Sequence, residues 1–376
     1  MNVKFTNTLI YNTEKRQFVS GTLCVSDGII VGGLADDAAF ETIDLKGRRM
    51  IPGMIDMHTH GHGGYESTVV DADGMKKMAE SYAGIGTTSF MVTMMSQPLD
   101  ILESCIDITS EVKKSGCRNI LGVYLEGRYI SLAKKGAHDP KYIAAPDADE
   151  LESLIRRADG AGVFCTICAP DIEGTKELVE RARELGASVS IGHTNATYEE
   201  CVECVGWGAG SYTHLFNGMS GFTHRAPGCA GAALSGDTYV ELICDGVHVA
   251  PAAVKVAYRA RAEKLILITD SAPAAGLPAG HYSMGGADVV VRDGAVYLSD
   301  GTLTGGSISL FEAMMNLTKF AGITLEEAIP TATKHPAEFL GVYDSVGSLD
   351  IGKRADFIIL DDKNDISEIY TGGVRV

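Results

Sequence analysis

The chain has 376 residues, of which 45% are hydrophobic, and its 44 glycines and 11 prolines are dispersed, which favours a packed core over disorder. The formal net charge of −17 repels phosphate backbones and anionic lipid, so we expect neither nucleic acid nor a membrane surface as a partner. No apolar run reaches membrane-spanning length, and MNVKFTNTLIYN has no basic segment followed by an apolar one, so we expect a cytoplasmic protein.

Both ends of the chain are predicted to be rich in β-structure. Residues 1–52 consist of short strand-like runs and turns, and residues 346–376 repeat this pattern in GSLDIGKRADFIILDD and TGGVRV. Two β-rich ends around a different middle predict one small β-sandwich domain assembled from both termini. Residues 53–345 are then the second, catalytic domain.

The middle of the chain alternates strands and helices. Its eight strand candidates are, in order, GMIDMHTH, TTSFMVTM, ILGVYLEG, VFCTICAP, SVSIGHTN, GSYTHLFN, VELICDGVH and LILITDSA. Helical patterns such as ADGMKKMAESYAGIG and TKELVERARELGA separate them. Strands that alternate with helices form a parallel sheet, and eight such units predict a closed (β/α)8 barrel of the TIM type.

Ionisable side chains end most of the predicted strands. In barrels of this type the active site is built at the carboxyl ends of the strands. The residues at those ends are His58 and His60 (strand one), Glu126 (three), His193 (five), His214 (six), Asp245 and His248 (seven) and Asp270 (eight). Five of the ten histidines stand there, whereas chance placement would scatter them.

His58 and His60 are predicted metal ligands. They flank Thr59, so the two-residue period of a strand places both imidazoles on one face. Neutral histidine is the commonest ligand for zinc-like ions, and imidazoles that face inward at a barrel mouth suit such an ion. The alternative, a pair of solvated loop histidines, is disfavoured by the donors at the other strand ends.

Glu126, His193 and His214 complete the predicted donor set. Glu126 ends an apolar run, where a carboxylate is costly unless a metal or another cation compensates its charge. One carboxylate between two metal positions can bridge them, and two imidazoles with a carboxylate leave an open position for water. For either histidine, the alternative is a hydrogen-bonded core residue.

Asp270 is the predicted general base. It follows LILIT and precedes SAPAAG, at the mouth of the barrel. A bound metal lowers the pKa of its water from 15.7 to about 7, and a carboxylate opposite can take the proton of that water and return it to a leaving group. The alternative, an N-cap of a following helix, fits less well because the next segment is rich in Pro and Gly.

The nine cysteines have no regular spacing, which suits reduced thiols better than a disulfide framework. Two pairs, Cys165 with Cys168 and Cys201 with Cys204, suggest a zinc ribbon. The first pair lies in an apparent strand, where residues three apart point to opposite faces, and the second lies in a helical stretch. We therefore expect ordinary buried thiols.

These motifs carry a resemblance. PGMIDMHTHG, the histidines of strands five and six and the aspartate of strand eight resemble the amidohydrolase superfamily. Within it, the N-acetylglucosamine-6-phosphate deacetylase family is similar in LEGRYISLAKKGAHDP, IGHTNATYEE, THLFNGMSGFTHRAPG, ICDGVHVAP, LITDSAPAAG and GTLTGGSISLFEAM. This resemblance covers nearly the whole chain and implies removal of acetate from an N-acetyl amino-sugar phosphate. No nucleic acid or membrane is implied.

The resemblance also implies roles. Glu126, His193 and His214 would hold the principal divalent ion and His58 with His60 a second, because some members lack this pair and use one metal. Zinc is the ion we expect, although iron, cobalt and manganese suit the same donors, with one or two ions in each subunit of a homodimer.

Asp270 would be the proton donor and acceptor. Substrate contacts carry over to Ala137, His138, Asn217, Gly218, Arg225, Asp245, Gly246, Val247, His248, Leu303, Thr304 and Gly305.

Three of these contacts have a physical rationale. The fork of donors on Arg225 suits a phosphate, with a surface ion pair as the alternative. The backbone at Asn217 and Gly218 follows a strand and can approach a phosphate closely. His138 is placed to hydrogen-bond the acetyl carbonyl or its developing oxyanion.

The sequence departs from the family at two positions. Arg128 replaces a usual Pro after LEG, and Gly218 replaces a usual Ala. Two other functions stay open: an amidohydrolase for a cyclic amide, an N-acyl amino acid or another sugar such as N-acetylgalactosamine 6-phosphate, and an inactive scaffold. Cyclic-amide members generally bridge their metals with a modified lysine, which no strand here supplies, and a scaffold would have lost its ligands.

Overall fold

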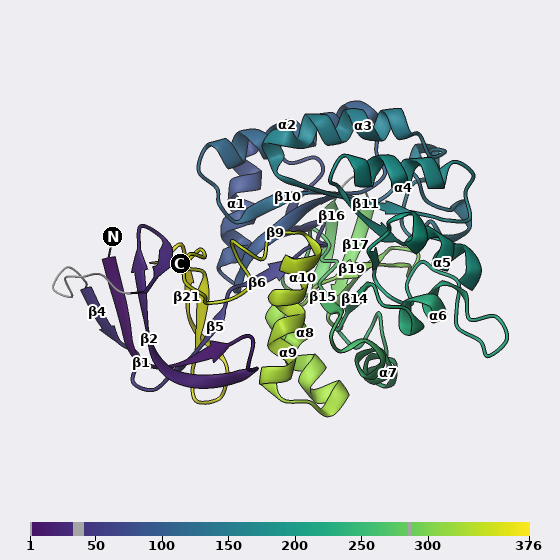
Figure 1. Cartoon of the computed structure of the whole chain (residues 1–376). Helices are drawn as coiled ribbons and strands as arrows, with labels where there is room; N and C mark the ends of the chain where they lie inside the picture. The colour runs from purple at the N-terminus through teal and green to yellow at the C-terminus, as the bar shows by residue number, and fades with distance from the viewer. Residues whose placement is uncertain (1, 33–40, 285–286) are drawn as a thin grey trace.

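Eight parallel strands form a nearly closed barrel at the centre of the molecule (Figure 1), in a computed structural model that describes residues 2–32, 41–284 and 287–376. The strands pair in chain order: β6 (Met54–Asp56), β9 (Thr87–Met94), β10 (Ile120–Leu125), β11 (Val163–Cys168), β12 (Ser188–Ile191), β13 (Ser211–Tyr212), β14 (Tyr239–Ile243) and β15 (Leu265–Ile268). Their residues are almost all buried because helices cover the outside and side chains fill the inside, which explains their continuous apolar sequences. The predicted fold class is confirmed.

The two ends of the barrel sheet are joined by hydrogen bonds between the segments that directly follow the first strand and the last. The backbone N–H of Asp270 donates to His58 O at 3.0 Å, and that of His60 donates to Ser271 O at 2.9 Å. The buried carboxylate of Asp56 accepts from the Thr269 hydroxyl at 2.5 Å. Two residues predicted for the site, His58 and Asp270, are thus locked side by side by backbone pairing.

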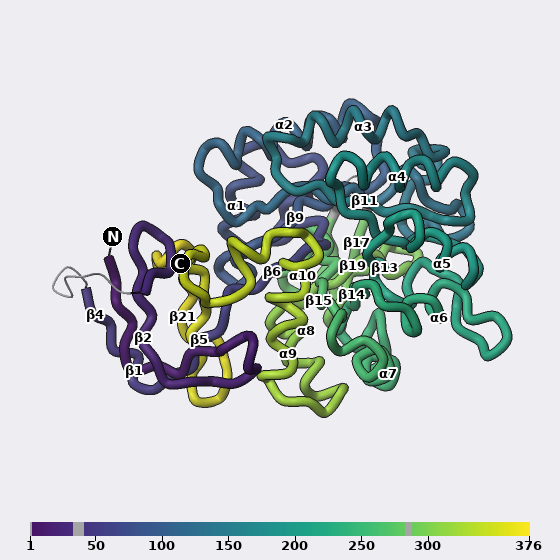
Figure 2. The backbone as a smooth tube through the Cα atoms, viewed as in Figure 1, coloured from purple at the N-terminus to yellow at the C-terminus, as the bar shows by residue number. Residues whose placement is uncertain are grey.

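Helices surround the barrel (Figure 2). They are α1 (Ala72–Ala83), α2 (Leu99–Lys114), α3 (Ala148–Arg157), α4 (Thr175–Glu184), α5 (Tyr198–Trp207), α6 (Gly228–Ser235), α7 (Pro251–Arg261), α8 (Leu310–Leu317), α9 (Leu325–Ala332) and α10 (Lys334–Phe339). Most of them bury one face. In α3, for example, Leu151, Leu154 and Ile155 recur at helical spacing and are buried, and Asp147 caps the first turn. None of the helices in the described ranges is both long enough and apolar enough to cross a bilayer.

Strands from both termini form a separate sheet beside the barrel, to the left in Figure 1. Its members are β1 (Asn2–Asn12), β2 (Gln17–Ser26), β3 (Ile29–Val31), β4 (Glu41–Asp44), β5 (Arg49–Pro52), β20 (Phe357–Leu360), β21 (Ile366–Thr371) and β22 (Val374–Arg375). β5 pairs with β20, which joins the two ends of the chain. The sheet has a core of its own, in which Phe357 stacks on Tyr370 with ring centroids 4.6 Å apart.

A four-stranded antiparallel sheet follows the last barrel strand and was not predicted. It contains β16 (Gly280–Met284), β17 (Ala287–Arg292), β18 (Ala295–Leu298) and β19 (Leu303–Gly306). The signal for it was Asp293–Gly294 between two apolar runs, because Asp-Gly favours a two-residue hairpin turn and both residues have positive φ, 52° and 79°. The N–H of Gly306 donates to Asp270 O at 2.8 Å, so this sheet is fastened to the mouth of the barrel. A short hairpin, β7 (Gly61–His62) with β8 (Tyr65–Glu66), lies between β6 and α1.

Candidate active site

The predicted site residues follow directly on the carboxyl ends of the barrel strands. Glu126 comes immediately after β10, and His193, His214 and Asp270 each come two residues after their strands. These last three residues have positive φ angles, 44°, 29° and 47°, which residues other than glycine rarely adopt. Such backbone costs on the order of 1–3 kcal/mol for each residue and concentrates at active sites, where the surrounding fold enforces it. The left-handed turns direct these side chains to one point.

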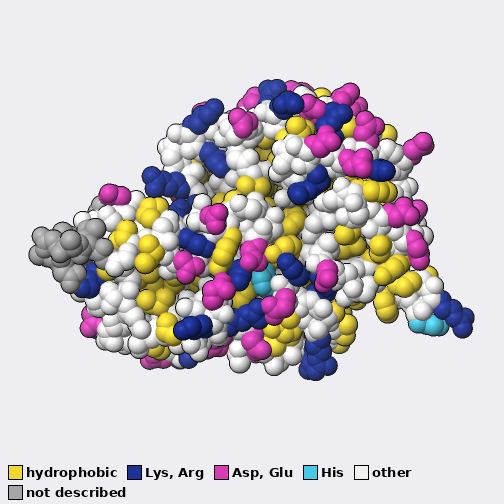
Figure 3. All heavy atoms as spheres, viewed as in Figure 1, with side chains coloured by type: hydrophobic (Ala, Val, Ile, Leu, Met, Phe, Trp, Pro, Cys, Tyr) yellow, Lys and Arg dark blue, Asp and Glu magenta, His cyan; other side chains and the backbone are white. Residues whose placement is uncertain are grey.

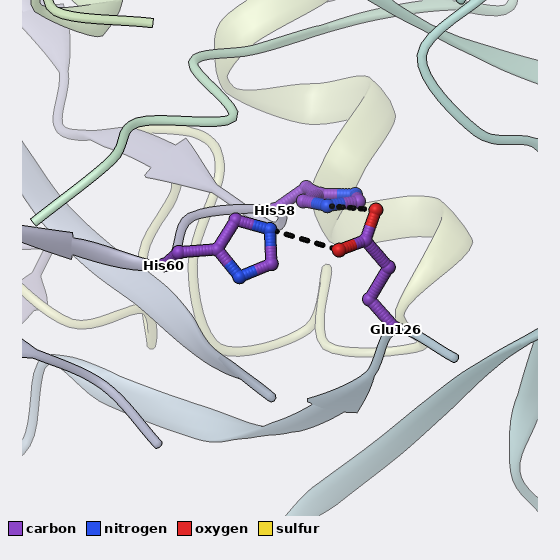
Figure 4. A group of neighbouring side chains, drawn as sticks. All are labelled: His58, His60 and Glu126. Carbon is purple, nitrogen blue, oxygen red and sulfur yellow. Dashed lines mark ion pairs between the residues drawn. The ribbon is translucent and has the colours of Figure 1, made fainter. Parts of the chain in front are cut away.

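Glu126 lies at the centre of a buried cluster of imidazoles. Its side chain is 3% exposed, and Figure 4 shows His58 and His60 directed at its two oxygens. Oε1 is 3.4 Å from His58 Nε2 and Oε2 is 3.0 Å from His60 Nε2. On its other side Oε1 is 3.1 Å from His193 Nε2 and 3.3 Å from His214 Nε2. The four predicted imidazole ligands therefore meet at the fifth predicted donor, the carboxylate of Glu126.

His193 and His214, the carbonyl-backed pair, are held by backbone oxygens. Nδ1 of His193 donates to Lys134 O at 2.7 Å, and Nδ1 of His214 donates to Asn217 O at 3.1 Å. Because a carbonyl only accepts, the proton of each neutral ring is on Nδ1 and the lone pair is on Nε2. The two Nε2 atoms are only 3.1 Å apart. Two lone pairs at this distance repel each other unless a cation lies between them or one ring is protonated.

His58 and His60, the 58/60 pair, occupy the side of Glu126 next to Asp270. Nε2 of His60 is 3.2 Å from Asp270 Oδ1, and Nε2 of His58 is 3.6 Å from the same oxygen. Both rings are buried, yet His58 Nε2 and His60 Nδ1 have no hydrogen-bond partner among the described residues. Nearly all buried polar atoms in proteins have a partner, so the unpartnered Nε2 of His58, which faces two carboxylates, is suited to bind a cation.

The donor set fits divalent metal. Histidine nitrogens and carboxylate oxygens are the ligands of zinc and of several other first-row ions. The described residues contain two clusters of three donors close enough to share an ion, His58 with His60 and Glu126, and Glu126 with His138 and His193.

His138 is better suited to donate a hydrogen bond than to hold an ion. The backbone N–H of Ser96 donates to its Nδ1 at 3.3 Å, so Nδ1 is an acceptor and the proton of the neutral ring is on Nε2. Burial lowers the pKa of His138, which keeps the ring neutral. Its Nε2 lies 3.4 Å from Glu126 Oε2. The ring thus presents an N–H at the cluster, as the oxyanion role requires.

The charges of the cluster shift its pKa values in opposite directions. Burial by itself lowers the pKa of His60, but the charges of Glu126 and Asp270 raise it, and the balance is a pKa of about 9. Burial by itself raises the pKa of Asp270, but the charges of His58 and His60 hold it well below the usual range of aspartate. Asp270 is therefore ionised at neutral pH and able to accept a proton.

A cavity of about 180 Å³ opens on the cluster and collects most of the predicted substrate contacts. Those that line it are Ala137, His138, Asn217, Gly218, His248, Leu303, Thr304 and Gly305. The last three come from β19, so the unpredicted sheet forms one wall. A second cavity of about 390 Å³ shares His60 and Thr304 with it and continues beneath β17 and β18.

Asn217, Gly218 and Asp245 shape the site through other residues. The backbone N–H of Asn217 donates to His214 O at 2.9 Å, so it is engaged within the chain. Gly218 has φ 56°, and a Cβ there would lie 3.1 Å from the His193 ring, so this position favours glycine. Asp245 does not line the cavity, but its carboxylate accepts from Nδ1 of His248 at 2.5 Å and orients that ring. Gly246 and Val247 lie in the same turn, outside the cavity lining.

Arg225 does not line the cavity of its own chain. It lies within six consecutive exposed residues, 221–226, and is absent from the residues that line either cavity at the cluster. This segment extends away from the barrel between β13 and α6 (Figure 2), and Figure 3 shows Lys or Arg and His side chains on the projection at the lower right. The sequence could not show this, because a motif places a residue along the chain and not in space.

Arg128, which departs from the family pattern, is paired away from the cluster. Its Nε lies 2.9 Å from Glu150 Oε1, and its Nη1 donates to Gln97 O at 3.0 Å. Its backbone has φ 67°, and its N–H donates to Ser96 Oγ at 2.9 Å. Proline can adopt neither feature, since its ring fixes φ near −65° and removes the N–H. The loop after Glu126 therefore differs locally from its proline-bearing counterpart.

Neither a more voluminous cavity nor the cysteines form a competing site. A cavity of about 660 Å³ lies between α1 and the C-terminal strands, and its Arg354 is ion-paired with Asp356. The nine cysteines are free, and all but the half-buried Cys117 are buried. Cys168 and Cys204 approach to 3.7 Å between sulfurs, but no cysteine belongs to either of the donor clusters found in the described residues.

Glu241, which the sequence analysis did not select, lies against the cluster. It sits inside β14, is fully buried, and its Oε2 is 3.2 Å from Nδ1 of His58. The available signal was a single glutamate inside the apolar run VELIC, where a charge needs a partner.

Comparison with known proteins agrees with this geometry. The model of the amidohydrolase family matches residues 49–375. The chain belongs to the amidohydrolase family. An amidohydrolase of Vibrio furnissii named N-acetylglucosamine-6-phosphate deacetylase is 33% identical over 89% of this chain and 84% of its own. An N-acetylgalactosamine-6-phosphate deacetylase of Escherichia coli O157:H7 is 33% identical over 96% of each chain.

Solved amidohydrolase structures match over the whole chain. The N-acetylglucosamine-6-phosphate deacetylase of Pasteurella multocida has a TM-score of 0.93 at 29% identity, with all of both chains covered. A variant of the Mycobacterium smegmatis enzyme, solved in complex with N-acetyl-D-glucosamine-6-phosphate, has a TM-score of 0.90 at 26% identity, covering 100% of this chain and 99% of its own. The fold is therefore that of an amidohydrolase enzyme.

Proposed function

We propose that this chain hydrolyses the N-acetyl group of N-acetyl-D-glucosamine 6-phosphate to give D-glucosamine 6-phosphate and acetate. The observation that carries the proposal is the meeting of five buried metal donors and Asp270 beside one cavity, which Asp270 and all of the donors except His58 line. Relatives named for this reaction, at about a third identity over most of the chain, support the choice of substrate.

The metal roles are part of the proposal. Glu126, His193 and His214 would hold the principal ion, and Glu126 with His58 and His60 would hold the second. Zinc is the ion we expect, and iron, cobalt and manganese suit the same donors. When bound, the ion supplies an acidified water molecule and a positive charge for the amide oxygen.

Asp270 and His138 would carry the proton transfers and the charge of the acyl group. Asp270, ionised at neutral pH, takes a proton from the attacking water through Oδ1 and delivers it to the amide nitrogen as the C–N bond breaks. The hydroxyl group that remains of the water becomes part of acetic acid, which loses its proton to give acetate. The Nε2–H of His138 donates to the acyl oxygen while negative charge develops there.

The phosphate would be bound in the cavity that opens on the donor cluster. Gly218, His248 and residues 303–305 line that cavity. In a chain with a net charge of −17, a substrate anion also needs a cation. Arg225 supplies one in our proposal, and its exposed position suits the cavity of a second copy in a homodimer better than its own.

The remaining proposals concern the whole chain. The strands of residues 1–52 and 346–376 would be a domain distinct from the catalytic barrel of residues 53–345, and the separate core around Phe357 supports this division. The free thiols suit a reducing compartment, so we propose a cytoplasmic location.

Acetate release from a panel of sugars tests the function. The panel contains N-acetylglucosamine 6-phosphate, N-acetylgalactosamine 6-phosphate and unphosphorylated N-acetylglucosamine. We expect the first to have the highest kcat/KM and the last to be poor. A higher value for the galacto sugar would assign the chain to the activity for which its Escherichia coli relative is named. Absence of acetate from all three, with metal bound, would refute the proposal.

Mixing two impaired variants tests the dimer. If Arg225 serves the partner, a heterodimer of Arg225→Met and Asp270→Asn contains one intact site, so a random mixture should regain about one site in four. The two variants mixed under conditions that prevent subunit exchange are the control. No recovery after proven exchange would place Arg225 in its own site or in none.

A further inference from the structure

Glu241 is a buried carboxylate in the interior of the barrel, below the metal donors. It is fully buried on β14, and the ion pair that the described residues give it is with His58, through Oε2 and Nδ1 at 3.2 Å. A buried charge is retained only where it is paired and hydrogen-bonded. Its surroundings therefore indicate what it is for.

Hydroxyl groups from other strands of the barrel fix this carboxylate. Oε1 accepts from Tyr124 on β10 and Ser190 on β12, each at 3.0 Å. Thr213, which follows β13, is 3.2 Å from both oxygens. With these donors in place, Glu241 cannot turn away, and its Oε2 remains directed at the ring of His58.

This contact determines which nitrogen of His58 carries the proton. A carboxylate accepts, so Nδ1 donates and the lone pair of the neutral ring is on Nε2. That Nε2 is the buried, unpartnered atom 3.4 Å from Glu126 Oε1 and 3.6 Å from Asp270 Oδ1. Hydrogen bonds from a second carboxylate orient metal-ligating histidines and make them more basic.

We infer that Glu241 is a positioning residue for the second metal ion, which holds His58 in the ligating tautomer and raises the affinity of the 58/60 pair alone. His193 and His214 rest on backbone carbonyls instead, so they do not depend on Glu241. The inference rests on the proposed metal function, because it assigns the support of one of the two proposed ions.

Metal titration of Glu241→Gln tests the inference, because glutamine keeps the shape and removes the charge. Metal-free protein is titrated with Zn²⁺ against a chromophoric chelator. We expect the second ion to bind roughly 10- to 100-fold more weakly and the first to be unchanged. The matched control is Glu338→Gln, since Glu338 also accepts from a tyrosine hydroxyl, that of Tyr239, at 3.0 Å, but lies on α10.

Each result of these titrations either supports the inference or overturns it. Unchanged affinity for the second ion in Glu241→Gln, or equal weakening of both ions, overturns the inference. If the wild-type protein binds one ion and releases acetate, the second site and the inference fail while the proposed function stands. If Glu241→Gln does not fold, Tyr124→Phe takes its place, because it removes one donor and leaves the charge. The second ion should then weaken a few-fold with the first unaffected, and no change would overturn the inference.

Discussion

The two pairs of histidines around Glu126 are held in different ways. The carbonyl-backed pair, His193 and His214, is hydrogen-bonded to main-chain oxygens, whereas His58 of the 58/60 pair is hydrogen-bonded to the side chain of Glu241. Every residue has a carbonyl, so the first support survives substitution of the residue that supplies it. The second support is lost with one mutation. The orientation of His193 and His214 therefore depends on the backbone, whereas the orientation of His58 depends on a single side chain.

Removal of one ligand from each pair should produce the largest differences in bound metal and in turnover. His193→Ala should lose most bound metal, and turnover should fall to background, because the principal ion loses a ligand. His58→Ala should lose only the second, weaker ion. Metal content by mass spectrometry and acetate release measure both. Full metal content and turnover in His193→Ala would contradict the assignment of the principal site.

Asp270 adjoins the 58/60 pair, yet its role is in proton transfer. Asp270→Asn keeps the shape but accepts no proton, so turnover should fall by roughly 10²–10⁴ while metal stays bound. The acid limb of the rate profile should vanish with it. Near-normal turnover in this variant would require another base.

Arg225 lies outside both pairs and should affect substrate without affecting metal. Arg225→Met removes a charge-assisted contact worth about 1.5–3 kcal/mol, or roughly 10- to 150-fold in kcat/KM for the phosphorylated sugar. The unphosphorylated sugar, already poor, should change little, and the metal content should stay the same. An equal loss for both sugars would show that Arg225 does not bind phosphate.

Acid should weaken the second ion by competition with protons. The metal-free protein has a pKa of about 9 at His60, raised by Glu126 and Asp270 against the effect of burial, and a metal binds only the neutral ring. The affinity is then full above about pH 9 and falls by up to about tenfold for each pH unit below it. Zn²⁺ titrations of His193→Ala, which retains the 58/60 pair, measure this slope. A flat profile between about pH 7 and pH 9 would contradict the prediction.

The features that the sequence predicts correctly are those that depend on a local sequence pattern. Short apolar runs between helical segments gave all eight barrel strands, and a rule about strand ends gave Glu126 and the histidines. Glu241 lies inside a strand instead of at its end, and its partners come from strands far apart in the chain, so no local pattern connects them. The place of Arg225 depends on the path of an exposed segment, which spacing does not determine.

The pairing of β5 with β20 has a consequence for how the chain is made. Chains emerge from the ribosome amino end first, but the strand that covers the edge of β5, at residues 49–52, begins only at residue 357. During synthesis of the entire barrel this edge therefore stays unpaired, and unpaired edges recruit strands from other chains. The terminal sheet is completed last. A nascent chain cut short before residue 357 carries all eight barrel strands but also an open, adhesive edge, so premature termination should produce aggregates in place of a smaller working enzyme.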